Sequence, residues 1–163
     1  MTFMVPFDGS SLARAALVRA TEYAEALDES VVVVSVIPDD EVYLRQQGWT
    51  QSEETFDIES VVESLREEVT ELSPDATFRY ERTTSSSPQS IAREIRAAAA
   101  DIRPTVVFLG SENVGEIVTP VSSVGGEVAA NVEYDVYIVR HWSQTTVSGL
   151  EPQLEQYPTT EES

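Results

Sequence analysis

Cysteine, lysine and histidine supply much of the chemistry of enzymes, and this chain of 163 residues has almost none of them. The absence of cysteine excludes disulfides, thiol nucleophiles and thiolate metal sites. All 10 basic residues are arginine, so no lysine is available for Schiff-base chemistry or for a phosphate-binding loop. His141 is the single histidine, which excludes a metal site built from several histidines.

Positive charge is scarce as well. The chain has 29 acidic residues and a net charge of −19, which repels nucleic acid and anionic lipid, so we expect neither as a partner. No apolar run reaches the roughly 18 residues of a membrane span, and no basic signal region opens the chain. We therefore expect a cytoplasmic protein. The excess of carboxylates without lysine predicts adaptation to a salt-rich cytoplasm, and the alternative is an ordinary acidic protein.

Short apolar runs alternate along the chain with segments of helical periodicity. Strands are predicted at residues 2–7, 31–37, 77–83, 105–109 and 135–140, with helices beginning near residues 12, 58, 87 and 120. Residues 31–37 are β-branched almost throughout, which is typical of a central parallel strand covered on both faces. The alternation predicts an α/β fold, a three-layer α/β/α sandwich around a parallel sheet.

The chain divides into one domain and a tail. Residues 1–140 carry the periodic pattern of the α/β domain, whereas residues 141–163 lose it. We expect this tail to be partly disordered or to dock on a partner subunit. Within the domain, the acidic stretch at residues 38–56 is too long for an ordinary strand-to-helix loop, so we expect a partial helix or a mobile cover there.

The predicted sheet brings two polar segments to one edge. Ligands of open α/β sheets bind at the carboxyl ends of strands, beside the point where the strand order reverses. Asp8 ends the first strand, and the loop at residues 110–115 follows the fourth. A carboxylate can accept hydrogen bonds from an adenine amino group or from ribose hydroxyls, and a Gly/Ser loop can present N–H groups to phosphate. The alternative is that Asp8 and Gly9 form only a turn and a helix cap.

Other nucleotide and hydrolase motifs are missing. Gly110 and Gly115 have the glycine spacing of a Walker A loop, but Glu116 occupies the lysine position. Neither G-x-G-x-x-G nor the nucleophile motif G-x-S-x-G is present. His141 stands beside Trp142 after the last strand, where we expect a surface or interface residue rather than a catalyst.

The opening residues match a known family motif. Residues 5–10 read V-P-F-D-G-S and resemble the first strand of universal stress proteins, written V-P-x-D-G-S. Similar residues follow at 34–37, 106–111, 122–124 and 136–140. The resemblance spans residues 2–140 apart from the stretch at 38–56. It implies a five-stranded parallel sheet of order 3-2-1-4-5 and a homodimer formed through the fifth strand.

ATP-binding members of this family carry G-x2-G-x9-G-[S/T] after the fourth strand. Gly110 and Ser123 match the ends of that motif, while Asn113 and Ser122 replace its second and third glycines with a spacing one residue shorter. Asn tolerates left-handed backbone angles and Ser is small, so the loop can still curl around phosphate. Glu112 places a negative charge where the family often has a basic residue, which costs affinity unless salt or Mg²⁺ screens it.

The resemblance implies a stress-response regulatory protein that binds ATP or AMP, with Mg²⁺, in the cleft between the first and fourth strands. The residues it implies for ligand binding are Asp8, Val36, Gly110, Asn113, Ser122, Ser123 and Val124. The alternative is a member that has lost nucleotide binding and acts as a dimeric interaction module. We assign no catalytic residue and no metal ligand, because the chain shows no base, nucleophile or lysine for catalysis, and weak Mg²⁺-dependent ATP hydrolysis is the most we expect.

Overall fold

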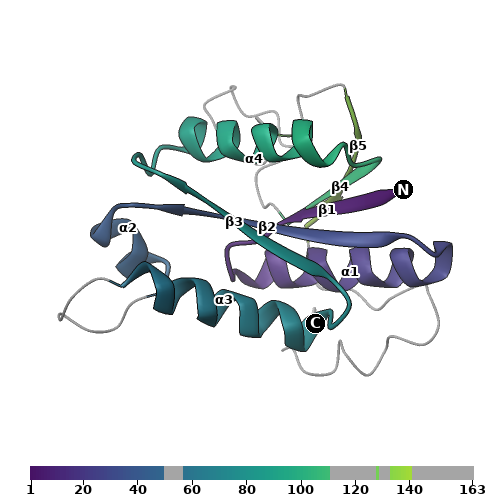
Figure 1. The fold of residues 1–163 in the computed structure, drawn as a ribbon, viewed down its shortest axis with the longest axis horizontal. Helices are drawn as coiled ribbons and strands as arrows, with labels where there is room; N and C mark the ends of the chain where they lie inside the picture. The colour runs from purple at the N-terminus through teal and green to yellow at the C-terminus, as the bar shows by residue number, and fades with distance from the viewer. Residues whose placement is uncertain (50–56, 111–127, 129–132, 141–163) are drawn as a thin grey trace, which may run out of the picture.

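The fold is a five-stranded sheet with helices on both faces, seen in a computed structural model that describes residues 1–49, 57–110, 128 and 133–140 (Figure 1). The strands are β1 (Thr2–Pro6), β2 (Ser30–Pro38), β3 (Thr77–Thr83), β4 (Val106–Gly110) and β5 (Asp135–Val139). All neighbouring strands run parallel, in the order β3-β2-β1-β4-β5. The predicted fold class and strand order are confirmed.

The apolar strands alternate their side chains between two cores. Val5 lies opposite Val33 of β2 in the sheet register, and both belong to the core that α1 (Ser11–Leu27) and α3 (Ile58–Leu72) cover. Met4 points to the other face, where Val34 and Val107 join the core beneath α4 (Pro88–Ile102). Because successive residues of a strand face opposite sides, a continuous apolar run fills both cores. Figure 1 shows the resulting three layers.

Helix α1 packs closely on the sheet because its buried face is rich in alanine. Ala13, Ala16 and Ala20 are buried, and Ser10 caps the helix by accepting the N–H of Ala13 at 3.2 Å. By its spacing from Leu12, Ala16 and Ala20 in the sequence, Leu27 is predicted on this buried face, but the residue is 60% exposed. The helix ends one residue later at Asp28, whose left-handed φ of 55° stops it.

The helices α3 and α4 begin where their caps predict. Ser87 accepts the N–H of Ser90 at 3.2 Å, and Pro88 occupies the first turn of α4, where its missing N–H costs nothing. Asp57 caps α3 in the same way. Of the helices that the described residues form, none is long and apolar enough to cross a membrane.

Residues 38–49 form a folded cover over the sheet edge. Asp40 caps a short helix, α2 (Glu41–Gln46), and the side chain of Leu44 in this helix is fully buried. The expectation of a partial helix is confirmed for this part, whereas residues 50–56 lie outside the described residues. The same holds for the helix predicted from Pro120, except for the buried Val128, and for the tail at residues 141–163.

Candidate functional site

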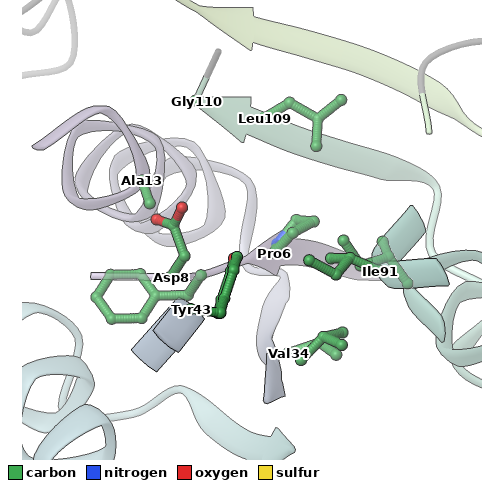
Figure 2. A pocket seen from close by; sticks show the side chains of 11 residues that line it. Pro6, Asp8, Ala13, Val34, Tyr43, Ile91, Leu109 and Gly110 are labelled. Carbon is green, nitrogen blue, oxygen red and sulfur yellow. The ribbon is translucent and has the colours of Figure 1, made fainter. Parts of the chain in front are cut away.

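A pocket of about 110 Å³ lies at the carboxyl ends of β1, β2 and β4 (Figure 2). This is the edge where the strand order reverses, because β1 in the middle of the sheet pairs with β2 on one side and β4 on the other. The pocket is lined by Pro6, Phe7, Asp8, Ala13, Val34, Val36, Tyr43, Ile91, Ile95, Leu109 and Gly110. Most of these side chains are aliphatic, so the pocket suits an apolar or flat aromatic group.

Asp8 is the one acidic residue among those that line the pocket. Its Oδ1 accepts the backbone N–H of Ser10 at 2.9 Å, and its main-chain carbonyl accepts the indole N–H of Trp49 at 3.0 Å. Among the described residues, Oδ2 accepts no hydrogen bond. The interpretation of Asp8 and Gly9 as a turn and cap therefore accounts for one carboxylate oxygen, and no residue in the described part of the chain donates to the other.

The turn after β1 is held by residues from two helices. Gly9 has a φ of 80°, a left-handed angle that favours glycine. Arg14 of α1 donates to the Gly9 carbonyl at 3.2 Å and pairs with Glu68 of α3 at 2.8 Å. Burial raises the pKa of Glu68 above its usual range, although the charge of Arg14 opposes that shift. These contacts fix the backbone that presents Asp8.

Tyr43 of α2 brings an aromatic ring to the pocket. Burial, and secondarily the negative charge of Asp8, raises the pKa of its hydroxyl to about 12, so the group stays protonated at neutral pH. The ring packs edge-on against Trp49, with 6.0 Å between centroids. Sequence reasoning missed Tyr43 as a site residue, although an aromatic soon after a central strand was a usable signal.

Gly110 has a packing role at the end of β4. A Cβ built on it would lie 2.7 Å from the backbone N of Ala13 and closer still to the carbonyl of Leu12. The first turn of α1 thus presses directly on the strand end. This close approach requires glycine there, whatever the loop that follows binds.

The structure brings three of the predicted site residues together. Asp8, Val36 and Gly110 line the same pocket, Val36 through a side chain that is largely buried. The other four, Asn113, Ser122, Ser123 and Val124, lie outside the described residues. Within the part of the chain that the structure describes, no group of three or more acidic or histidine side chains could hold a metal ion.

Comparison with known proteins identifies the family. Residues 1–140 match the model of the Universal stress protein family. The chain belongs to the universal stress protein family. Its resemblance through the V-P-x-D-G-S motif is therefore confirmed, and the sheet order is the one that the resemblance implied. No curated protein sequence matches the chain.

Solved universal stress proteins share the fold at low sequence identity. One, in complex with cAMP, has 19% identity and a TM-score of 0.55, covering 85% of this chain and 96% of its own. UspA from Lactobacillus plantarum has 17% identity and a TM-score of 0.56, covering 86% and 97%. A protein from Archaeoglobus fulgidus in complex with dAMP has 17% identity and a TM-score of 0.50, covering 85% and 97%.

Proposed function

We propose that this universal stress protein binds an adenine nucleotide, ATP or AMP, with the base in the pocket at the ends of β1, β2 and β4. The observation that carries the proposal is an aliphatic pocket with a single carboxylate at the point where the strand order reverses. Val36 and Leu109 offer apolar contact to the faces of the base, and Asp8 offers an acceptor for its amino group or for ribose hydroxyls.

The pocket is too small for a whole nucleotide. Its volume is about 110 Å³, below the roughly 300–1,000 Å³ of sites that enclose drug-sized ligands and below the apolar cavity of about 150 Å³ that holds benzene, so only part of a base enters it unless its side chains move. The ribose and phosphates then extend out of the pocket. We propose that the residues following Gly110 in the chain contact them, namely Asn113, Ser122, Ser123 and Val124. The two relatives that bind cAMP and dAMP support an adenine ligand.

Titration calorimetry with ATP and AMP in molar KCl tests the proposal. Asp8→Asn retains an oxygen that can accept the Ser10 N–H but removes the negative charge, and we expect weaker binding by about 1–3 kcal/mol, roughly 5- to 150-fold in Kd. Glu112→Arg should have the opposite effect on ATP, since it replaces a like charge near the proposed phosphates with a bidentate donor.

The matched control for Asp8→Asn is Asp28→Asn. Asp28 is exposed at the end of α1, and its left-handed backbone angle is one that Asn adopts readily. The control should bind like the parent. Equal Kd values for the parent, Asp8→Asn and Glu112→Arg would contradict the proposed site, and absence of binding by the parent would contradict the function.

A dimeric interaction module is the second candidate function, and two observations favour it. The indole N–H of Trp49 donates to the Asp8 carbonyl, which is then not free to bind a ligand. The Tyr43 ring occupies one side of the pocket, so the pocket has little space for a ligand. In addition, β5 is an edge strand whose Val136 and Ile138 are only partly buried. Unpaired strand edges with apolar side chains favour pairing with another chain.

We propose that two copies pair along β5. Tyr137 stacks inward on Phe108 at 5.1 Å and receives a hydrogen bond from Arg19 at 2.9 Å. Val136 packs against the core beneath α4, so Ile138 is the side chain of β5 that best tests the contact. Light scattering in molar KCl should give the mass of a dimer, and Ile138→Lys should give a monomer. A monomeric parent at tens of micromolar would contradict the pairing. The cytoplasmic location, the bound Mg²⁺ and the stress-response role remain predictions from the sequence.

A further inference from the structure

Tyr43 is held in place by contacts that need no ligand. The carboxylate of Asp40 accepts the backbone N–H groups of Val42 at 3.0 Å and Tyr43 at 3.3 Å, which starts α2 at a defined residue. Leu44 anchors the helix in the main core with a fully buried side chain. The ring of Trp49 supports the Tyr43 ring from its edge. An aromatic ring fixed in this way loses little entropy when a ligand contacts it.

The Tyr43 ring forms one side of the pocket. In the view of Figure 2 the plane of the Tyr43 ring is seen from its edge, so that one ring face is turned toward Asp8 and the other toward the aliphatic side chains. Ile91 of α4 lies on the opposite side of the pocket. Val34 and Leu109 line the pocket between them. A space bounded by an aromatic face and by aliphatic groups accepts a flat ring more readily than a non-planar sugar or a charged phosphate.

We propose that Tyr43 is a specificity-determining residue, the aromatic wall on which the ligand's base stacks. This stacking role rests on the proposed function, which puts a base in the pocket. It identifies Tyr43 as the group that selects a flat heteroaromatic ring. The stacking uses the ring face and not the hydroxyl. Base–aromatic stacking accounts for roughly 5- to 150-fold in affinity when the aromatic residue is removed.

Three variants separate the ring from the hydroxyl and from the helix. Tyr43→Phe keeps the ring, Tyr43→Leu replaces it with an aliphatic group, and Val42→Thr changes a neighbouring side chain that is 63% exposed and outside the pocket. Titrations with adenosine and with Mg-ATP should show Kd values within about twofold of the parent for Tyr43→Phe and Val42→Thr. For Tyr43→Leu, we expect both Kd values to rise by the same factor, roughly 5- to 150-fold.

If Tyr43→Leu does not fold, a measurement on the parent protein tests the stacking role instead. In the parent protein, nuclear Overhauser contacts should connect the adenosine H2 or H8 proton to the Tyr43 ring protons, and the adenosine signals should move upfield. Absence of those contacts in saturated parent protein would overturn the stacking role.

The outcomes distinguish this inference from the function on which it rests. If the parent binds adenosine and Tyr43→Leu binds it equally well, the stacking role is wrong while the nucleotide site stands. If Tyr43→Phe loses as much affinity as Tyr43→Leu, the hydroxyl is responsible and the stacking role is also wrong. If the parent binds neither adenosine nor Mg-ATP, the proposed function fails and the stacking role fails with it.

Discussion

At the residue scale, Gly110 is the point where the end of β4 packs against the start of α1. The backbone of Leu12 and Ala13 lies so close that the strand end has no space for a side chain. This contact sets the distance between β4 and α1, which both contribute residues to the lining of the pocket. Because the constraint is steric, it acts with or without a bound ligand.

Gly110→Ala should destabilise the protein strongly. The added methyl group forces β4 or α1 to move, and overpacking of this kind costs about 1–3 kcal/mol or more. Urea unfolding followed by circular dichroism measures the loss. Gly48→Asn is the control, since Gly48 has a φ of 75° and open space around it, and Asn tolerates that angle. A Gly110→Ala protein within 0.5 kcal/mol of the parent, about the spread of ordinary surface substitutions, would contradict the packing.

At the element scale, the N-terminus of α2 is capped by one carboxylate, that of Asp40. Asp40 receives a hydrogen bond from the Ser86 hydroxyl at 2.9 Å in addition to the N–H groups of Val42 and Tyr43. The Ser86 hydrogen bond, followed by that from Tyr43, lowers the pKa of Asp40 below its usual range. The charged form is therefore the one that the folded state favours. Asp40 links α2 to the segment between β3 and α4.

The contribution of Asp40 should depend on pH. The pKa of Asp40 is lower in the folded protein than in the unfolded chain, where it is near 4. Ionised Asp40 therefore stabilises the fold above about pH 4, and this stabilisation is lost as the pH falls through the pKa of the folded state. Asp40→Ala should lower the melting temperature at pH 6, and its difference from the parent should shrink toward pH 3.

Asp40→Asn is the matched variant for this test, because Asn caps helices as well as Asp but does not titrate. It should melt near the parent at pH 6 and show a flatter pH profile. A parent-to-alanine difference that stays constant from pH 6 to pH 3 would show that the charge of Asp40 does not contribute.

At the scale of the whole molecule, charge repulsion opposes compaction. The net charge is −19, and α3 carries exposed carboxylates at four-residue spacing: Glu59, Glu63, Glu67 and Glu71. Residues four apart on a helix are neighbours, so these like charges repel one another. Arg66 offsets part of the repulsion through a 3.5 Å pair with Glu63. The repulsion is long-ranged in dilute buffer, where the Debye length is about 30 Å at 0.01 M salt.

The melting temperature should therefore rise between 0.01 M and molar KCl. Glu67→Gln with Glu71→Gln should raise the melting temperature in dilute buffer and reduce its dependence on salt. Each change removes repulsion between neighbouring carboxylates, about 0.2–0.5 kcal/mol apiece, and the change at Glu71 also removes an unfavourable charge in the last turn of α3. Glu59→Gln is the control, because an acid in the first turn interacts favourably with the helix dipole and its loss should bring no gain. A melting temperature independent of salt would contradict salt adaptation.

Much of this architecture follows from local sequence signals. The β-branched residues of β2 predict a central strand, and Ser87 with Pro88 predicts the start of α4, because strand propensity and helix capping depend on residues close together in the chain. Asp8 and Gly110 were predicted to meet at one site, because the carboxyl ends of neighbouring parallel strands converge at one sheet edge. Val36 was expected there from the family resemblance.

Tertiary packing decided what local signals could not. An aromatic residue soon after a central strand is a signal for Tyr43, but it does not place the ring in the pocket. That position depends on Leu44 entering the core and on Trp49 bonding to Asp8, 41 residues away. The steric need for glycine at position 110 likewise arises from α1, which lies about a hundred residues earlier in the chain. The sequence by itself determined the order of the elements and the edge where the site lies. Only packing between distant segments determined the shape of the pocket and the aromatic ring that borders it.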